Sequence, residues 1–496
     1  MSFHPLYRAQ ALREIERQAG AQARPPLMER AGLAIARAAG TLRMDLPLPI
    51  LVVAGPGNNG GDALVAARHL ADWGMAVDLV FTGRIERLSA DARRAWNAWA
   101  STGRPSHADI PPAGRWSLAI DGLFGTGLTR DIGEADRRRI ARINALPCPV
   151  LSIDVPSGLD ADTGLVRGSA VRATLTVTML ARKPGLYTLD GKDLVGRIQF
   201  EDLGADAPSL VAPEGFLLDR SVSSFLPRRP ANSHKGHFGQ IGILGGADTM
   251  LGAAFLAGSA ALLAGAGRVH LGLLAADLPG FNPCQPELMV RPAEALLAME
   301  RLTCLVAGPG LSQSTQAKRC LTQALERDMP LVLDADALNL LGQYPDLAAR
   351  VPARSAATVL TPHPLEAARL LRRAPADIQR DRIGAAGELA RRFQSYTVLK
   401  GSGSVCAEPA GTYYVNPTGN PGLASAGTGD VLSGILGALI GQGLAAPDAL
   451  RLGVYLHGAA ADDQVARGEG PIGLTASEVA LAARRVLNDW VYGPPL

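Results

Sequence analysis

Short apolar runs that end in glycines, each followed by a stretch with helical periodicity, recur along this 496-residue chain. The run 49–54 (PILVVA) leads into the glycine-rich stretch 55–64 (GPGNNGGDAL), and a helix is expected from about 62 to 73. Strands that alternate with helices predict βαβ units and a mostly parallel sheet with both faces covered. A continuously apolar strand is typical of such a sheet, because both of its faces are buried.

The same alternation predicts the other elements and two domains. In the first part, helices are expected at 8–19, 28–39, 90–100 and 134–145, and strands at 77–81, 117–121 and 150–154. The Pro-rich stretch from about 204 to 236 indicates a domain boundary. In the second part, strands are expected at 240–244, 302–307, 331–334, 358–360 and 397–400, with a hairpin at 404–415. We therefore expect two α/β domains, 1–215 and 225–496.

Composition and charge exclude several classes of protein. The chain has 49 Lys and Arg against 46 Asp and Glu, so its net charge of +3 gives no electrostatic support for a nucleic-acid partner. Hydrophobic residues make up 47%, enough for large cores. The cysteine count of five is odd and lacks a Cys-x-x-Cys pair, which argues against a disulfide scaffold or zinc site and favours the reducing cytoplasm. The first 20 residues do not resemble a signal peptide.

Two long uncharged runs, 249–267 and 431–447, need a separate explanation. Both are rich in Gly and Ala rather than in large apolar residues, and each follows a glycine turn. Tightly packed buried helices explain this composition better than a membrane span does. No membrane partner is therefore expected.

Three loops of the first part have the residues of a ligand site. In 55–64, glycines allow backbone amides to approach a ligand, and Asn58, Asn59 and Asp62 offer oxygens to a polar ligand or a monovalent cation. The loops 121–128 (DGLFGTGL) and 154–160 (DVPSGLD) also follow expected strands. In open α/β sheets the ligand crevice lies at these strand ends, so the three loops should converge. The alternative is that Asp62, Asp121 and Asp154 only cap turns.

Together with LMERAG (27–32), the motifs GNNGGD (57–62), DGLFGTGL and DVPSG resemble the NAD(P)H-hydrate epimerase family over about residues 5–215. That family binds a nicotinamide cofactor whose ring has gained water, and it interconverts the R and S forms. The resemblance implies a Rossmann-like three-layer αβα domain, with Asp154 as the catalytic acid or base. It implies K⁺ coordination by Asn59, Asp121 and Ser157. The implied hydrate-binding residues are Asn58, Asn59, Gly60, Gly61, Asp62, Gly125, Thr126, Gly127, Leu128, Thr129, Arg130, Asp131 and Asp154.

The stretch 420–439 (NPGLASAGTGDVLSGILGAL) is the most informative part of the second half. Its glycine loop leads into an apolar helix, so loop amides and the helix N-terminus form an anion site. Asp430 lies where it could accept a proton from a substrate hydroxyl. The alternative is that Asp430 is only the helix N-cap.

Three other expected strand ends carry polar groups. KGSGS (400–404) offers Lys400 and backbone amides, TPHPLE (361–366) offers His363 and Glu366, and GPGL (308–311) offers a close backbone approach. His363 alone would be read as a structural or surface histidine, and Lys400 alone as a solvated strand end. At successive strand ends they indicate one crevice. A P-loop lysine motif is absent from the sequence.

These motifs resemble the ADP- or ATP-dependent NAD(P)H-hydrate dehydratase family, which has a ribokinase-like fold, over about residues 225–490. Two positions depart from the family pattern: Ala426, where many relatives have glycine, and Arg268, where an apolar residue is usual. Further supporting motifs are HKGHFGQIGILGG (234–246), MLGAAFLAGSAALLAGAG (250–267) and DADALNLL (334–341). The resemblance implies that the hydrate contacts Ala253, Gly310, His363 and Asp430. It implies that the adenine nucleotide contacts Lys400, Gly401, Ser402, Gly403, Ser404 and Gly429.

The implied activity is repair of the hydrated cofactor in two steps. The epimerase supplies the S form, and the dehydratase converts it to NAD(P)H at the expense of ADP, giving AMP and phosphate. The phosphoryl group moves to the ring hydroxyl with Asp430 as the base, and phosphate then leaves. Mg²⁺ is expected near the phosphates, with Glu366 as its suggested neighbour. Both families commonly form oligomers, so a homo-oligomer is expected. The expected partners are small molecules, namely the hydrates and ADP, and the expected compartment is the cytoplasm.

Two rival hypotheses remain open from the sequence. The second domain could be a small-molecule kinase of the ribokinase-like class, and a stable phosphorylated product without regained near-ultraviolet absorbance would favour it. The first domain could be a module that only binds a nucleotide or a protein. Turnover of the R form that survives Asp154→Ala would favour the module.

Overall fold

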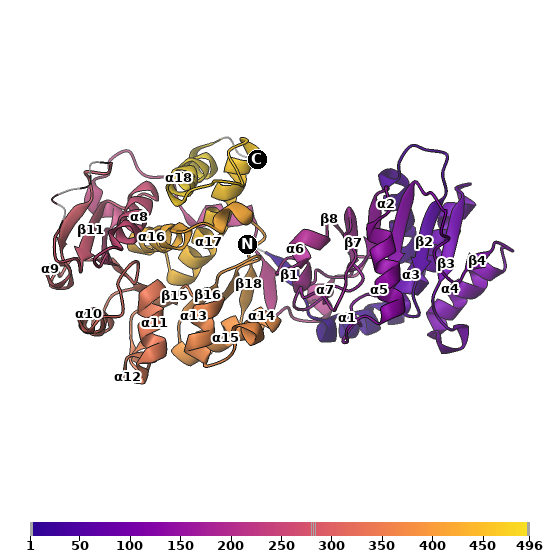
Figure 1. Cartoon of the computed structure of the whole chain (residues 1–496), viewed down its shortest axis with the longest axis horizontal. Helices are drawn as coiled ribbons and strands as arrows, with labels where there is room; N and C mark the ends of the chain where they lie inside the picture. The colour runs from indigo at the N-terminus through magenta and orange to yellow at the C-terminus, as the bar shows by residue number, and fades with distance from the viewer. Residues whose placement is uncertain (1–2, 279, 281, 283, 494–496) are drawn as a thin grey trace. The chain divides into compact units, whose positions relative to one another are not determined.

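The computed structural model describes residues 3–278, 280, 282 and 284–493. The chain divides into two compact units, shown in Figure 1. The N-terminal unit comprises His4–Gly215, and the C-terminal unit comprises the described residues from Phe216 onward together with Phe3. The division therefore falls inside the Pro-rich stretch 204–236.

The N-terminal unit is built on a seven-stranded sheet of order β4-β3-β2-β5-β6-β7-β8, in which every pair is parallel. Its strands are β2 (Ile50–Ala54), β3 (Val77–Phe81), β4 (Ser106–His107), β5 (Leu118–Gly122), β6 (Val150–Ile153), β7 (Leu175–Met179) and β8 (Arg197–Glu201), with β1 (His4–Leu6) outside this sheet. Its helices are α1 (Ala9–Gln22), α2 (Leu27–Leu42), α3 (Asn58–Asp72), α4 (Ala90–Ala100), α5 (Glu134–Asn144), α6 (Gly191–Leu194) and α7 (Ala207–Leu210).

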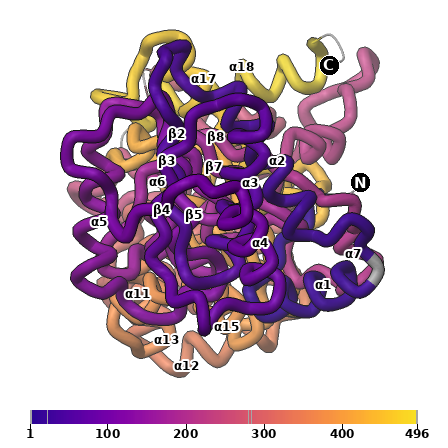
Figure 2. The backbone as a smooth tube through the Cα atoms, turned by 90° about the vertical axis from the view of Figure 1, so that its right-hand side faces the viewer, coloured from indigo at the N-terminus to yellow at the C-terminus, as the bar shows by residue number. Residues whose placement is uncertain are grey.

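Strand β2 shows why this sheet is covered on both faces. Ile50 and Val52 point into a core formed with α2, α3 and α4. Leu51 and Val53 point into a second core, which contains Ile140 of α5. Figure 2 shows α5 on one side of the strands and α3 and α4 on the other. The predicted αβα layering is confirmed.

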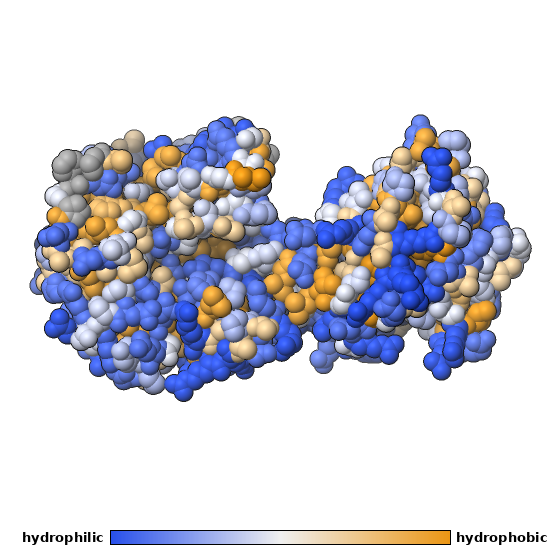
Figure 3. Space-filling model, in the orientation of Figure 1, coloured by the Kyte–Doolittle hydropathy of each residue, from blue (hydrophilic) through white to orange (hydrophobic). Residues whose placement is uncertain are grey.

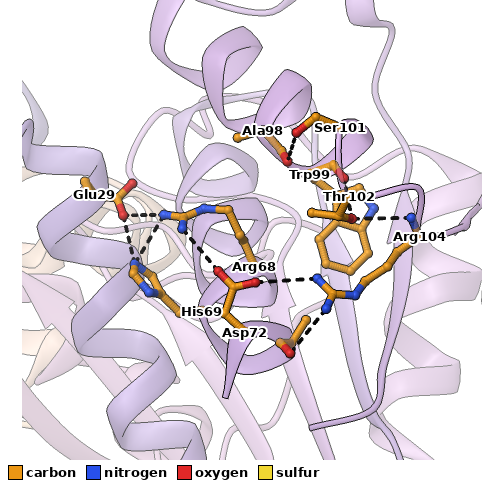
Figure 4. Close-up of polar contacts among 10 residues, drawn as sticks. Glu29, Arg68, His69, Asp72, Ala98, Trp99, Ser101, Thr102 and Arg104 are labelled. Carbon is orange, nitrogen blue, oxygen red and sulfur yellow. Dashed lines mark hydrogen bonds and ion pairs between the residues drawn. The ribbon is translucent and has the colours of Figure 1, made fainter. Parts of the chain in front are cut away.

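The LMERAG motif packs α2 against α3. A Cβ atom on Gly32 would lie 2.3 Å from Cγ1 of Val65, so the helices can approach this closely only with glycine at 32. Glu29 forms an ion pair with Arg68 of α3 and lies 2.8 Å from Nε2 of His69 (Figure 4). Arg68 also contacts Asp72, which in turn pairs with Arg104. These contacts explain the motif by helix packing.

Two features of this unit differ from the expectation. Helix α3 begins at Asn58, and its N-cap is Gly57, so Asp62 lies inside the helix and the reading of Asp62 as a cap is wrong. Strands β7 and β8 were not predicted, because LTVTM and RIQFE are short runs without a following glycine motif. Both strands extend the sheet beyond β6.

The C-terminal unit has a mixed sheet of order β9-β18-β17-β16-β15-β14-β13-β10-β11-β12. Its strands are β9 (Gly215–Leu217), β10 (Gln240–Gly245), β11 (Arg268–Leu273), β12 (Met289–Pro292), β13 (Cys304–Ala307), β14 (Leu331–Leu333), β15 (Thr358–Leu360), β16 (Tyr396–Leu399), β17 (Val405–Ala407) and β18 (Tyr413–Val415). Its helices are α8 (Leu251–Leu263), α9 (Ala293–Leu297), α10 (Thr315–Leu325), α11 (Ala335–Gln343), α12 (Pro345–Ala348), α13 (Pro364–Leu371), α14 (Pro375–Arg380), α15 (Arg382–Phe393), α16 (Thr428–Gly441), α17 (Ala446–Ala466) and α18 (Ala476–Tyr492).

From β12 at one edge to β16, all neighbouring strands pair in parallel. Strand β17 pairs antiparallel with both β16 and β18, so the predicted hairpin at 404–415 is confirmed. Alternate residues of β10, Ile241 and Ile243, point into the core formed with α8, α16, α17 and α18. Gly242 instead faces Leu296 of α9, on the opposite side of the sheet. The lower edge of this unit in Figure 3, where α12 and α15 lie, is mostly hydrophilic, as expected for helices that bury one face only.

The two uncharged runs form helices α8 and α16, which pack against each other. A Cβ atom on Gly434 of α16 would lie 2.0 Å from the carbonyl oxygen of Ala257 in α8, so small residues allow the helix backbones to approach. The prediction of packed buried helices is confirmed. Within the described part of the chain, no helix is long and apolar enough to cross a membrane.

This close approach gives a stability prediction. Gly434→Ala is expected to destabilise the C-terminal unit by about 1–3 kcal/mol, because the new methyl group must push α8 and α16 apart. Gly252→Ala is the matched control: it is also a glycine in one of these helices, but its Cβ would meet no atom within 4 Å. Denaturant unfolding measures both variants. Equal stability of the two would contradict the packing argument.

Candidate functional site

The three loops of the N-terminal unit meet at the C-terminal ends of β2, β5 and β6, which are neighbours in the sheet. Asn59, after β2, donates its side-chain amide to the carbonyl of Phe124, after β5, at 3.0 Å. Ser157, after β6, donates its hydroxyl to Oδ1 of Asp121 at 2.6 Å. The strand order therefore brings together the residues singled out from the sequence. We call this cluster the first site.

Asp121 is fully buried and holds the loops together. Its Oδ2 accepts from the hydroxyl of Ser152 and the amide of Ser157, both at 2.9 Å, and its Oδ1 accepts from Ser157 and from the amide of Leu123. Burial raises the pKa of Asp121, and the hydrogen bonds from Ser157 and Ser152 oppose that rise. Asp121 therefore caps its own turn through the amide of Leu123, as the alternative held. It also binds Ser157, so its side chain joins two loops.

The residues beside Asp121 are compatible with a bound K⁺. The carbonyl of Phe124 and the hydroxyl of Ser157 lie 3.2 Å apart. Rotation of the Asn59 amide, which now points its nitrogen at Phe124, would add a third oxygen. A cation with a preference for oxygen ligands suits this set. Asp121 would act mainly through its charge, because its oxygens already accept four hydrogen bonds.

Asp154 is held by a buried lysine that the sequence reasoning missed. The Lys183 ammonium forms an ion pair with Asp154, and it donates to Oγ1 of Thr178 at 3.1 Å and to the carbonyl of Met179 at 2.7 Å. Only 1% of Lys183 is exposed, so all three of its donors are used inside the protein. The Met179 amide also donates to Asp154. Asp154 itself adopts a left-handed conformation with φ of 64°, which bends the chain after β6.

Two further carboxylates act electrostatically on this position. Burial raises the pKa of Asp62 well above its ordinary value, and the charges of Asp154 and Glu16 raise it further. Glu16, on α1, accepts a hydrogen bond from the side chain of Asn58 at 3.3 Å, and Asn58 accepts one from Ser89. Burial also raises the pKa of Glu16. Glu16 was missed because α1 carries no motif.

The other predicted residues of the first site differ in their surroundings. Gly60 and Gly61 are buried in α3, and a Cβ on Gly125 would lie 3.1 Å from Oδ1 of Asn59. Thr126 and Leu128 are half-buried, whereas Gly127, Thr129, Arg130 and Asp131 are exposed. Of the predicted residues 125–131, Gly125 is the one that the structure places against Asn59. The roles of the others stay predictions.

In the C-terminal unit, a buried ion pair joins the ends of two parallel strands, β14 and β16, which lie on either side of β15. The ammonium of Lys400, after β16, donates to Oδ1 of Asp334, after β14, at 2.8 Å. Ser433 of α16 donates to the other oxygen of Asp334 at 2.6 Å. Burial alone would raise the pKa of Asp334, but the Lys400 charge holds it below its ordinary value. The sequence reasoning named Lys400 but gave Asp334 no role. We call this cluster the second site.

Asp430 lies beside this ion pair, in the first turn of α16. The N-cap of the helix is Gly427, whose φ of 86° is left-handed, so the reading of Asp430 as the N-cap is wrong. Burial raises the pKa of Asp430 to about 7, and the charge of Asp334 adds to this rise while Lys400 opposes it. A carboxylate with a pKa near 7 in the first turn of a helix suits proton transfer at neutral pH.

His363 and Glu366 form the N-terminal cap of α13. Nδ1 of His363 accepts from the amides of Leu365 and Glu366, and the carboxylate of Glu366 accepts from the amide of His363 at 2.8 Å. The hypothesis that His363 is a structural histidine therefore explains the role of Nδ1, which caps the helix. Burial raises the pKa of Glu366 to about 7. The cap uses one oxygen of Glu366, and its place near Mg²⁺ stays a prediction. No cluster of three His, Cys, Asp or Glu that could hold a metal occurs among the described residues.

The remaining predicted residues fall into two groups. A Cβ on Gly429 would lie 3.3 Å from Nζ of Lys400, so the glycine loop and the KGSGS loop (400–404) meet. A Cβ on Gly310 would lie 3.2 Å from Cβ of Ala253, so these two positions meet as well. Gly401 is exposed, Gly403 is buried and Ser404 is half-buried, while Ser402 is exposed and partnered.

The two departures from the family pattern cause no conflict. Ala426 is exposed in the loop before α16, where its methyl group displaces nothing. Arg268 begins β11 and donates to Oε1 of Gln240 at 3.2 Å. Both substitutions are therefore compatible with the fold.

Comparisons with known proteins were made for the sequence and for the fold. Residues 241–481 match the family model described as NAD(P)H-hydrate dehydratase, and residues 25–185 match the model described as YjeF-related protein N-terminus. The bifunctional NAD(P)H-hydrate repair enzyme Nnr of Coxiella burnetii is 38% identical, over 97% of this chain and 99% of that protein. The enzyme of the same name from Escherichia coli K12 is 39% identical, over 89% and 85%.

A solved ribokinase-like superfamily protein from Enterococcus faecalis matches with a TM-score of 0.50 and 24% identity, covering 57% of this chain and 99% of that chain. The ribokinase-like fold predicted for the C-terminal unit is thus confirmed. Two α/β units, each with charged residues gathered at the ends of parallel strands, have the architecture of a two-domain α/β enzyme. The chain belongs to the family of bifunctional NAD(P)H-hydrate repair enzymes.

Proposed function

We propose that this chain repairs hydrated nicotinamide cofactors at two sites. The first site interconverts the R and S forms of NAD(P)H hydrate, and the second site converts the S form to NAD(P)H with ADP as the phosphoryl donor, giving AMP and phosphate. The observation that carries the proposal is Asp430. Its carboxylate, with a pKa raised by burial to about 7, lies at a helix N-terminus beside Lys400 and Asp334.

Acid–base chemistry at the first site accounts for epimerisation. The hydroxyl of the hydrate is on a ring carbon that is bonded to the ring nitrogen. Once protonated, the hydroxyl leaves as water, and the lone pair of the nitrogen forms a double bond to that carbon. Water then adds to the opposite face and loses a proton to a base. Asp62, with its raised pKa, suits the acid, and Asp154, whose counter-ion is Lys183, suits the base.

Phosphoryl transfer at the second site accounts for dehydration. Asp430 accepts the proton of the hydrate's hydroxyl as the oxygen attacks the terminal phosphorus of ADP, and AMP leaves. Phosphate is a better leaving group than hydroxide, so the ring nitrogen then expels it. Loss of a ring proton restores the dihydronicotinamide. His363, Ala253 and Gly310 are proposed to contact the hydrate, and the amides of the KGSGS loop and Gly429 the nucleotide.

Two metal ions complete the proposal. K⁺ beside Asn59, Asp121 and Ser157, with the carbonyl of Phe124 as a further oxygen, would hold the loops of the first site and supply positive charge there. Mg²⁺ would offset phosphate charge in the second site. Because Mg²⁺ commonly binds through one or two carboxylates plus substrate phosphates, we propose that it arrives with the nucleotide.

The compartment and assembly are also part of the proposal. All five cysteines are free, which supports the cytoplasm, where thiols stay reduced. A homo-oligomer is proposed from the family resemblance, and light scattering during size-exclusion chromatography measures it.

Nucleotide dependence tests the whole proposal. A mixture of R and S NADH hydrate is incubated with the protein and with ADP, ATP or no nucleotide, and recovery of NADH is followed by absorbance. We expect near-complete recovery with ADP and none without nucleotide, because water adds back at the first site, and only the second site couples departure of the oxygen as phosphate to loss of the ring proton. AMP and phosphate should form in equal amounts with NADH.

Other outcomes point to the rival functions. Recovery without nucleotide would contradict the phosphoryl-transfer step. A stable phosphorylated product without regained absorbance would show that the second site is a kinase. Recovery that stops at the S fraction would show that the first site does not epimerise.

A further inference from the structure

Arg382 is a buried arginine directly beneath the KGSGS loop. It is the first residue of α15, and only 2% of it is exposed. Its side chain reaches from α15 to the end of β16, where the loop begins. Nothing in the sequence singles it out, since it stands in an ordinary amphipathic helix.

The guanidinium of Arg382 holds both ends of this loop. Nη2 donates to the carbonyl of Leu399, the residue before the loop, at 3.1 Å, and lies 3.5 Å from the carbonyl of Gly403. Nη1 donates to Oε1 of Gln379 at 3.0 Å. All three acceptors are neutral oxygens. Nε has no hydrogen-bond partner among the described residues.

The loop backbone runs across the guanidinium. A Cβ atom on Gly401 would lie 2.6 Å from Nη1 of Arg382, and the φ of Gly401 is 144°. Position 401 therefore requires glycine both for its conformation and for the contact with Arg382. Arg382 and the loop fit each other as one assembly.

The charge of Arg382 is present at neutral pH and is not neutralised by its hydrogen-bond partners. Burial lowers its pKa to about 10, so the group stays protonated at pH 7. A buried cation with neutral partners produces a positive potential at the nearby surface. An anion on the outer side of the loop would be attracted by this potential.

We propose that Arg382 is a positioning residue of the nucleotide site: it clamps the KGSGS loop and supplies a fixed positive charge beneath it for the phosphate groups of ADP. This inference rests on the proposed function of the second site. The guanidinium binds the carbonyls of Leu399 and Gly403, so these two oxygens are turned away from phosphate groups on the outer side of the loop. Arginine suits this role because its planar guanidinium is oriented by Gln379 through Nη1 while Nη2 faces both loop carbonyls.

The test compares three variants of the full chain. Arg382→Gln removes the charge and the planar guanidinium, and Arg382→Lys keeps the charge alone. Arg380→Gln is the matched control, because it removes a charge two residues away on an exposed side chain that pairs with Asp377. The measurements are KM for ADP, KM for the hydrate, kcat, and the rise in Tm that ADP produces without hydrate.

We expect Arg382→Gln to raise KM for ADP about 10- to 100-fold, the range for losing hydrogen bonds of a charged group. The ADP-induced rise in Tm should fall correspondingly, while KM for the hydrate stays within about twofold. Arg382→Lys should recover part of the lost affinity through its charge. Arg380→Gln should behave as the unaltered protein does.

Two results would overturn the inference. One is an unchanged KM for ADP in a folded Arg382→Gln protein, and the other is an equal rise in KM for ADP and KM for the hydrate. The Tm of each variant without ADP reports whether its C-terminal unit is folded. If Arg382→Gln does not fold, Arg382→Lys decides, and wild-type affinity in that variant contradicts the clamp. Binding of ADP, measured by Tm, separates this inference from the proposed reaction, which fails if ADP binds and no NADH is recovered.

Discussion

Asp430→Asn is expected to lower nucleotide-dependent recovery of NADH by about 10³-fold, the typical contribution of a general base. The asparagine keeps the size of the side chain but cannot accept the proton of the hydrate's hydroxyl. The measurement is the initial rate of absorbance recovery with S hydrate and saturating ADP. The R and S forms should still interconvert, because the first site lies in the other unit.

The pH dependence of the unaltered protein tests the same role. Burial raises the pKa of Asp430 to about 7, so the proton-accepting carboxylate predominates only above that pH. The rate should therefore increase as the pH rises through about 7 and then level. An Asp430→Asn protein that keeps ADP binding and residual activity should lose this increase.

Two results would contradict the role of Asp430. One is recovery by Asp430→Asn at a rate within tenfold of the unaltered protein. The other is a rate that still increases through about pH 7 in Asp430→Asn, which would assign the titration to another group. Retention of the ADP-induced rise in Tm separates lost chemistry from lost binding.

Asp154→Asn is expected to limit recovery to the S fraction of a mixed hydrate sample. The first site then lacks its base, and epimerisation should fall by about 10²- to 10⁴-fold. The dehydratase rate with pure S hydrate should not change. Chromatographic separation of the two forms over time measures the exchange directly.

Lys183→Met extends this test to the partner of Asp154. Because Lys183 is 1% exposed and bonded to Asp154, its removal leaves a carboxylate without its counter-ion, and exchange should fall in the same direction. Asp193→Asn is the control, since Asp193 is exposed in the same unit. Unaltered exchange in both Asp154→Asn and Lys183→Met would support a unit that only binds its ligand.

The loops of both sites were predictable, but their electrostatics were not. Asn59 and Ser157 follow strands that the apolar pattern identifies, Asp121 lies at the end of another, and parallel order brings such strand ends together. Lys183 follows an unpredicted strand and reaches Asp154 across 29 positions. Its one available signal was scarcity: the chain has only five lysines.

Asp430 also shows that the sequence alone left the role of a predicted residue open. Its place after a glycine loop indicated a base, yet the alternative of an N-cap remained until Gly427 was seen to occupy that position. Similarly, the sequence indicated His363 and Glu366 as ligand contacts, and only the structure showed that both side chains also cap α13. Which backbone group a polar side chain satisfies depends on where the helix begins, and helix ends are weakly determined by local pattern.

The sequence by itself determined the two α/β units, the strand-end loops and the residues those loops carry. These follow from apolar periodicity and glycine placement, which are local along the chain. Only the tertiary structure decided which charges meet: Asp334 pairs with Lys400 across 66 positions and with Ser433 across 99. Arg382 likewise lies beneath the KGSGS loop. Ionisation and counter-charge depend on burial and on neighbours from distant segments, and these exist only once the sheet has assembled.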